Sequence, residues 1–175
     1  ANTASGDGGD IELDNLKTLF LNQESFISAN TTDGTAGDII INATDSVTVE
    51  NNSKLASESV GDGIAGNIDI DTNQLNITDN SQANVSSKGN GSAGSIFVKA
   101  NNVFLGNTAE IAAKTKEFGT DGHISLDILN NLELSDSLIS VSTINGEAGD
   151  IDINARDSIK LSNHSMIASE AKGDG

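Results

Sequence analysis

Carboxylates are the side chains in this sequence best able to act as acids, bases or metal ligands, with 26 Asp and Glu residues in 175. Two carboxyl groups can cleave a glycosidic bond when they lie about 5–9.5 Å apart. Glu12 and Asp69 hold the same outward position in repeats that are two apart, so the spacing of strands in a sheet separates them by about 10 Å. That distance is long for such a pair, Arg156 is the only Arg, and Tyr and Trp are absent. The sequence therefore predicts that the chain is not an enzyme.

Residues that could bind a metal are few and scattered. His123 and His164 lie at different positions of the repeat and Cys is absent, so the sequence lacks the ligand cluster of a zinc site. Calcium needs six to eight oxygen ligands. Several aspartates lie at or beside one glycine-rich corner, namely Asp33, Asp38, Asp62 and Asp150. We therefore expect no cofactor, with Ca²⁺ as the alternative that the sequence leaves open.

The charge of the chain is strongly negative, with a formal net value of −17. A surface this acidic repels nucleic acid and anionic membranes, which we exclude as partners. The sequence has no apolar stretch of about 18 residues, so this segment is not expected to insert into a membrane. Hydrophobic residues make up 35% of the chain and recur in short alternating runs, which favours a packed β-structure over disorder.

An internal repeat organises the chain. A glycine precedes an apolar–x–apolar triplet six times, at intervals of 27 to 29 residues. These glycines are Gly9, Gly37, Gly66, Gly94, Gly122 and Gly149. Each repeat holds three such triplets, which in the second repeat are Ile39–Ile41, Val47–Val49 and Leu55–Ser57. A period of two residues is typical of strands whose side chains alternate between a core and solvent.

The repeat predicts an all-β fold: a right-handed parallel β-helix, or β-solenoid, with three short strands per coil and about six coils of about 28 residues. Equivalent residues would stack about 4.8 Å apart, and parallel crossovers are nearly always right-handed. Two columns of Asn and Asp fit the corners, because these residues tolerate the left-handed conformation. The first column is Asp45, Asn73, Asn101, Asn130 and Asp157, and the second is Asn51, Asp79, Asn107, Asp136 and Asn163.

Two further columns complete the predicted coil. A serine column follows the second corner, where small hydroxyl side chains could hydrogen-bond from coil to coil; it includes Ser53 and Ser81. The outward column of the third strand consists of small residues and predicts a flat face, but it is not the threonine array of an ice-binding surface. It reads Ser28, Ala56, Asn84, Ala112, Ser140 and Ala168. The third corner is variable, and we expect it to be irregular at Phe118 and Asp121.

Residues 1–175 are predicted to form a single β-solenoid array. The first residues match the end of a third strand and the last ones fall within a third corner. Since solenoids need capping ends, we expect the chain to be a segment of a longer protein. Pairing of its ends with other copies, which would build a fibre, is the alternative.

The repeat resembles a known family. The pattern Gly-Asp-Ile-x-Ile-x-Ala-x-Asp-Ser-Val-x-Val runs from Gly37 to Val49 and returns from Gly149 to Leu161. It is similar to the repeats of filamentous-haemagglutinin-like exoproteins of bacterial two-partner secretion. The resemblance implies a secreted or cell-surface bacterial protein. It also implies that these repeats form a structural or adhesive shaft, which projects a binding tip or forms a filament.

Outward-facing hydrophobic residues are the remaining candidates for a site. By the alternation of the triplets, Ile40, Phe97, Phe104, Phe20 and Phe26 point outward. Exposed apolar residues in a group can mark a contact surface, so we interpret them as a possible lateral contact with a second shaft or another partner. A module that binds a host or matrix glycan or protein through its side faces is the alternative function. A polysaccharide-active β-helix enzyme is a remote one.

Overall fold

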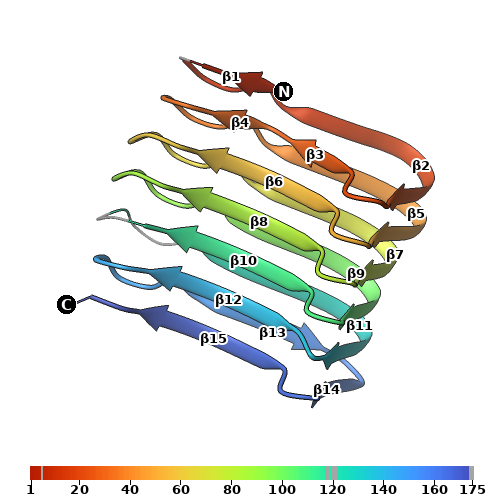
Figure 1. Ribbon diagram of the computed structural model, residues 1–175. Helices are drawn as coiled ribbons and strands as arrows, with labels where there is room; N and C mark the ends of the chain where they lie inside the picture. The colour runs from red at the N-terminus through yellow and green to blue at the C-terminus, as the bar shows by residue number, and fades with distance from the viewer. Residues whose placement is uncertain (5, 117–118, 120–121, 174–175) are drawn as a thin grey trace.

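The computed structural model describes residues 1–4, 6–116, 119 and 122–173. It confirms an all-β parallel β-solenoid of about six turns, each of about 28 residues, and the described residues contain no helix. Figure 1 shows the turns stacked in chain order, with the N-terminus at one end of the stack and the C-terminus at the other. The predicted irregularity at Phe118 and Asp121 lies outside the described residues.

Two parallel sheets run along the stack, and we call them sheets A and B. Sheet A consists of β1 (Asn2–Thr3), β4 (Asn30–Thr31), β6 (Lys54–Ser59), β8 (Gln82–Ser87), β10 (Glu110–Thr115), β12 (Leu138–Thr143) and β15 (Met166–Ala171), with β3 (Phe26–Ser28) paired to β6. Sheet B consists of β2 (Ile11–Leu21), β5 (Ile39–Val49), β7 (Ile68–Ile77), β9 (Ser95–Gly106), β11 (His123–Ser135) and β13 (Ile151–Ala155), with β14 (Ser158–Ser162) paired to β11. Each coil therefore pairs only with the coils before and after it.

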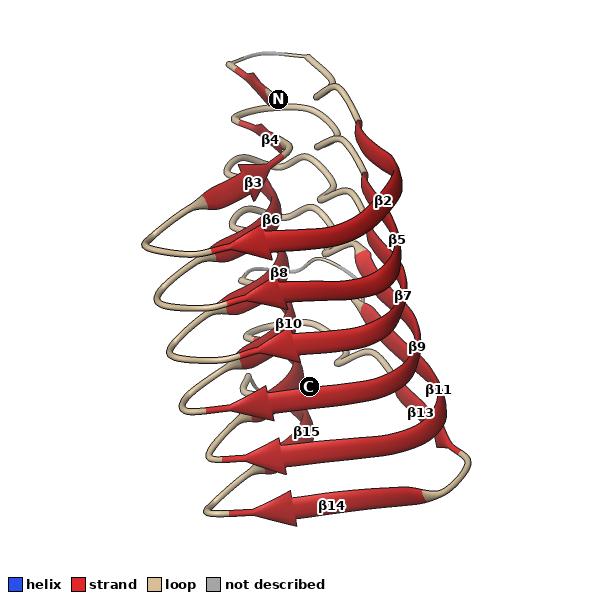
Figure 2. Cartoon of the chain, turned by 90° about the vertical axis from the view of Figure 1, so that its right-hand side faces the viewer, coloured by secondary structure: helices blue, strands red, loops and turns tan. Residues whose placement is uncertain are grey.

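The first two triplets of a coil form one long bent strand, which is visible as the curved arrows of Figure 2. The chain turns this corner through a shift of register, for example between Ile128 and Asn131 in β11, as a β-bulge does. The Asn and Asp column predicted for this corner does not adopt the left-handed conformation; Asn15 is the left-handed residue of this corner in the first coil. Only β13 and β14 separate the two triplets into distinct strands.

The second corner has the predicted left-handed residues. Every member of its Asn and Asp column has a φ between 51° and 55°. Side chains there also join the coils: Nδ2 of Asn107 donates to Oδ1 of Asp79 at 2.9 Å. In the adjacent serine column the backbone N–H of Ser53 donates to Oγ of Ser81 at 3.0 Å. The corner is thus built from residues that tolerate its geometry and satisfy one another's polar groups.

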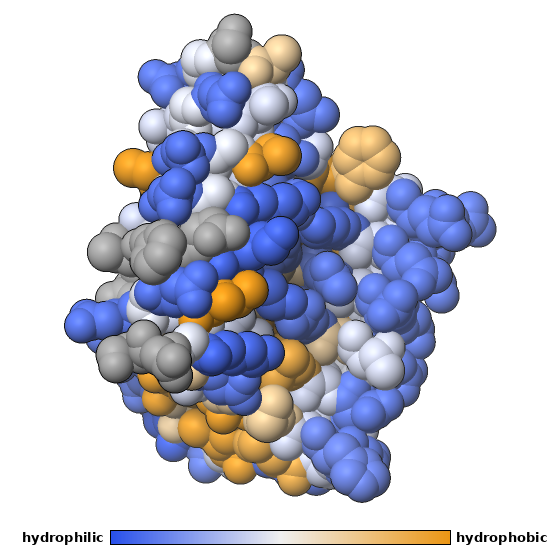
Figure 3. All heavy atoms as spheres, turned by 60° about the vertical axis from the view of Figure 1, so that its left-hand side comes forward, coloured by the Kyte–Doolittle hydropathy of each residue, from blue (hydrophilic) through white to orange (hydrophobic). Residues whose placement is uncertain are grey.

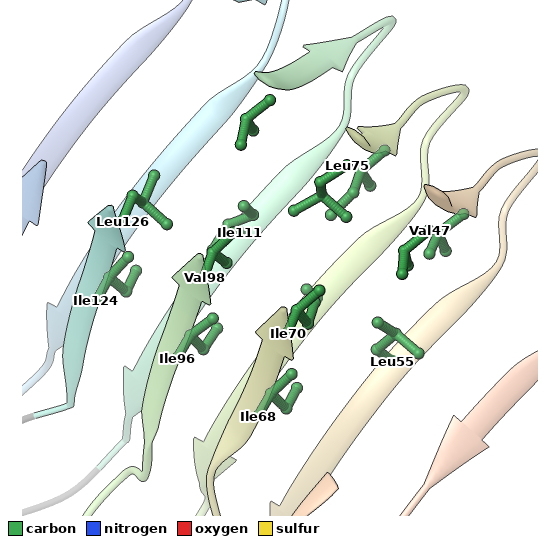
Figure 4. Packing of buried hydrophobic residues seen from close by; sticks show 14 of the residues in the cluster. Val47, Leu55, Ile68, Ile70, Leu75, Ile96, Val98, Ile111, Ile124 and Leu126 are labelled. Carbon is green, nitrogen blue, oxygen red and sulfur yellow. The ribbon is translucent and has the colours of Figure 1, made fainter. Parts of the chain in front are cut away.

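The core lies between the sheets and contains the inward side chains of the three triplets. Figure 4 shows these side chains pointing toward one another from neighbouring coils. Ile68, Ile70, Leu75 and Leu55 are fully buried, so each contributes about 1.5–3 kcal/mol of transfer free energy. Figure 3 shows hydrophilic residues over much of one face, with hydrophobic ones gathered toward the C-terminal end.

The glycine that recurs before each first strand has a packing reason. A Cβ on Gly66 would lie 2.2 Å from the carbonyl oxygen of Gly37, and one on Gly94 would lie 2.0 Å from that of Gly66. Successive coils therefore approach so closely at this column that only glycine fits. Gly9 is different, because a Cβ there would meet only the Cβ of Ala1, at 3.8 Å.

Candidate functional site

The hydrophobic residues predicted to make a lateral contact are outward-facing but do not form one patch. Phe20, Phe26 and Phe97 are 61%, 72% and 40% exposed, whereas Ile40 and Phe104 are half-buried. Phe26 belongs to sheet A and the other four to sheet B. A lateral contact at these residues stays a prediction.

Polar residues separate the members that share a column. Asp69 lies between Ile40 and Phe97 in the sheet register, and two coils separate Phe20 from Phe104. The ring of Phe97 lies next to the imidazole ring of His123, with ring centroids 6.2 Å apart. The sequence predicted the outward direction of these side chains, but the structure does not group them into one hydrophobic cluster.

The carboxylates considered for catalysis are similarly dispersed. Ile40 separates Glu12 from Asp69 in the sheet register. Burial raises the pKa of Asp69, and the nearby charges of Asp71 and Asp38 raise it further. Among the residues that the structure describes, Asp69 forms no ion pair that would relieve this repulsion between like charges, so the arrangement resembles a crowded acidic surface more than an acid–base pair.

Two of the four aspartates considered for calcium, Asp38 and Asp62, accept hydrogen bonds from the chain itself. Oδ1 of Asp38 accepts a hydrogen bond from the backbone N–H of Asn67 at 2.6 Å. Oδ1 of Asp62 accepts from the backbone N–H and from Nδ2 of Asn90, at 3.0 and 2.9 Å. Among the described residues no three His, Cys, Asp or Glu side chains converge on a point that could hold a metal ion. These donors therefore do not form the oxygen cage that calcium requires.

A groove lies on the outer face of sheet A, among the residues that the structure describes. Its volume is about 600 Å³. Five of the nine Lys and Arg residues line it, in a chain whose net charge is −17. These are Lys54, Lys88, Lys114, Lys116 and Lys172.

The groove borders the column of small residues that was predicted to form a flat face, and Asn84 is the member of that column that lines it. Ala56 and Ala112 point outward from the core, yet they are only 2% and 0% exposed. They are covered because long side chains cross above them. Lys54 pairs with Glu58, two residues to either side of Ala56, and Lys114 Nζ lies 2.7 Å from Oε1 of Glu110 across Ala112. The small residues of this column are thus overlaid by long flanking side chains.

Glu58 is the electrostatic centre of the groove. Its carboxylate contacts Nζ of Lys54, and it accepts from Nζ of Lys88 and from Nδ2 of Asn84, both at 3.2 Å. Burial works to raise the pKa of Glu58, but the hydrogen bonds and charges of Lys54 and Lys88 outweigh it, so the pKa lies below its ordinary value. The carboxylate therefore stays ionised and holds two of the lysines in place.

The remaining groups of the groove have spare binding capacity. Lys116 makes no ion pair with any residue that the structure describes, and Lys172 lies 3.8 Å from a carboxylate oxygen of Glu170. Oδ1 of Asn84 is buried without a hydrogen-bond partner among the described residues. An unpaired buried acceptor is costly, so this oxygen favours a site that is completed by another molecule.

Sequence reasoning missed the groove, although a signal for it exists. Lys88, Lys116 and Lys172 differ by 28 and 56 residues, so they occupy one column just after the third strand, with Ile144 between the last two. A search for like charges at the repeat interval would have aligned them. The ion pairs Lys54–Glu58 and Lys114–Glu110 gave no comparable signal. Their partners are four residues apart, a spacing that marks neighbours on a helix but does not single out a pair in a strand.

Comparison with known proteins assigns no relative to the chain: no family model matches it, and neither the curated proteins nor the solved structures give a significant match. The fold is therefore defined as a parallel β-solenoid of about six turns, without an identified family. None of the described segments forms a helix long and apolar enough to cross a membrane.

Proposed function

We propose that this chain is a structural and adhesive shaft of a secreted or surface-anchored bacterial exoprotein, projecting a binding tip or building a filament, without a catalytic role. The observation that carries the proposal is the continuous pairing of each coil with the next through both sheets. Such stacking fixes every coil relative to its neighbours and gives a stiff, elongated spacer. The repeat pattern from Gly37 to Val49, which resembles that of secreted exoproteins, supports the extracellular location.

Small-angle X-ray scattering tests the role of a spacer. Tandem duplication of residues 39–95 adds two repeats in register, which should lengthen the particle by about 10 Å without changing its cross-section. An increase in cross-section at constant length would contradict the proposal.

Antibody labelling of intact cells tests the location, and a signal that appears only after lysis would contradict it.

The groove favours a second candidate, a module that binds a partner through its side face. The shaft and the binding module differ in what the isolated chain does. A shaft needs no ligand, whereas a binding module should give a reproducible signal on a glycan array. The two functions are compatible, because the groove lies on the side of the stack and leaves its ends unchanged.

A further inference from the structure

We propose that the groove on sheet A binds an acidic polysaccharide, a linear chain of sugars that carries carboxylate or sulfate groups. The inference adds a ligand site to the molecule and does not depend on the role of a shaft. It rests on three properties of the groove: the line of lysines, the hydroxyl-rich lining, and the unpaired oxygen of Asn84.

The lysines form a line along the axis of the solenoid. Lys88 and Lys116 belong to adjacent coils, so their backbones are about 4.8 Å apart, and Lys172 follows two coils later. Their side chains are 51% exposed at Lys88 and 64% at Lys172. A row of cations in one column suits a ligand with repeated anionic groups better than a single anion. It also gives a local positive potential on a molecule that is otherwise strongly acidic.

The rest of the lining matches the hydroxyl groups of sugars. Ser86, Ser142 and Asn84 lie in the groove between the lysines. Asn84 is 8% exposed, and its Oδ1 lacks a donor. A sugar hydroxyl that reaches this oxygen from the groove would supply the missing donor. Hydrogen bonds of this kind orient a polar ligand once charge has attracted it.

The same lining argues against nucleic acid as the ligand. None of the described residues that line the groove is an aromatic on which a base could stack, and stacking is a main source of affinity for single strands. The whole molecule, at −17, also repels the dense charge of a duplex. Lysine supplies point charges, which accept carboxylate and sulfate alike, so the experiment must separate these two forms of the ligand.

Titration calorimetry at low salt tests the proposal with polygalacturonate as the carboxylate ligand and dextran sulfate as the sulfate ligand. We expect at least one to bind, neutral dextran to give no signal, and the affinity to fall as salt is raised. The double variant Lys116→Gln and Lys172→Gln removes two exposed cations of the groove. It should weaken binding about tenfold, the effect of losing two exposed ion pairs.

The matched control is the double variant Lys99→Gln and Lys160→Gln, which removes the same charge from sheet B. It should bind as tightly as the original chain, and circular dichroism should show that both variants fold. An equal loss in the two double variants would reveal non-specific attraction and overturn the proposal. So would the absence of binding to both ligands, or equally tight binding of single-stranded DNA.

Discussion

At the scale of single residues, Glu58 shows how this solenoid turns a buried charge into a structural contact. Its side chain is 11% exposed and is held by Lys54 and Lys88. Glu170 occupies the same column of sheet A, but its side chain is 45% exposed and its nearest ammonium group lies at 3.8 Å. The two glutamates thus provide a natural comparison between a buried, paired carboxylate and an exposed one.

Replacing Glu58 by Gln should lower the free energy of unfolding by about 1–3 kcal/mol at neutral pH, because Lys54 and Lys88 lose their counter-charge. The pKa of Glu58 is lowered in the folded state. Its stabilising effect is therefore present above the unfolded pKa of about 4.3 and is lost as the pH falls through the folded value. Urea unfolding across this range should show the gap between the two proteins closing on acidification.

The control for that experiment is Glu170→Gln, which should change stability by less than about 0.5 kcal/mol at any pH. A deficit of the Glu58 variant that persisted unchanged at acid pH would contradict the electrostatic explanation and point to a packing effect instead.

Thr108 is a second informative residue, since it is a β-branched side chain in the left-handed conformation, with a φ of 64°. The equivalent residues Asn52 and Asn80 adopt the same conformation with a φ of 62°. Thr108→Asn should therefore stabilise the protein by up to about 1 kcal/mol. Thermal unfolding would measure the gain. Thr48→Asn is the matched control at a regularly paired position of β5, and an equal gain there would refute the conformational argument.

At the scale of the element, the repeating unit is a coil that is held by contacts at its corners as well as by its strands. The glycine column demonstrates this, because a Cβ at Gly37, Gly66 or Gly94 would lie 2.0–2.2 Å from a carbonyl oxygen of the preceding coil. A side chain at such a position has to push two coils apart.

Gly66→Ala should therefore destabilise the protein by about 1–3 kcal/mol, the range typical of an overpacked interior. Gly9→Ala is the matched control at the same position of the repeat, where a Cβ would have room. Denaturant unfolding of the two variants checks the expectation. Similar stabilities for both would show that the stack relaxes to admit a methyl group.

Much of the coil could be predicted from the sequence, and the reason is the period of its side chains. The triplet at Ile68–Ile70 alternates as required, and its two isoleucines are fully buried. The corner after it was less predictable. Asn and Asp fit both a left-handed turn and a bulge, and only the register of the neighbouring strands decides between them. The column at Asn101 accordingly lies in a bent strand, whereas the column at Asn107 turns sharply.

The groove could not be predicted in the same way. The column that contributes Asn84 to its lining was predicted correctly as a column of mostly small outward residues. The depth of the groove depends on the lengths and directions of the side chains around that column. Those are set when Lys54 meets Glu58 across the strand and Lys88 meets Glu58 from a neighbouring strand. Contacts of this type arise between side chains in three dimensions and leave no period in the sequence.

At the scale of the whole molecule, the net charge of −17 sets the balance of long-range forces. Self-repulsion of this size destabilises a compact state, and salt screens it over about 8–10 Å. We expect added sodium chloride to raise the Tm by a few degrees, since about 1 kcal/mol shifts the Tm by about 2–4 °C at this size. Thermal melts followed by circular dichroism would measure the shift.

The control for the salt experiment is a variant in which Asp45 and Asp157, which are exposed and form no ion pair with a described residue, are replaced by Asn. It should respond less to salt because it has less repulsion to screen. A Tm that falls with salt would show that the ion pairs on sheet A outweigh the repulsion.

Side-by-side association of two shafts is also tested on the whole molecule. If Phe97 and Phe104 mark a lateral contact, the variants Phe97→Ser and Phe104→Ser should reduce association in sedimentation experiments. Val60→Ser, which also removes an exposed apolar side chain, is the control. Unchanged association in the phenylalanine variants would exclude the contact.

The pairing of each coil with its neighbours alone has a mechanical consequence. Tension applied to the two ends of the chain has to detach the outermost coil before it reaches the next, so the molecule should unwind one turn at a time. Each released turn of about 28 residues extends to about 90–100 Å, although it occupied only about 4.8 Å of the stack. A stiff rod of this design therefore stores roughly twentyfold its own length as a reserve that it releases under load.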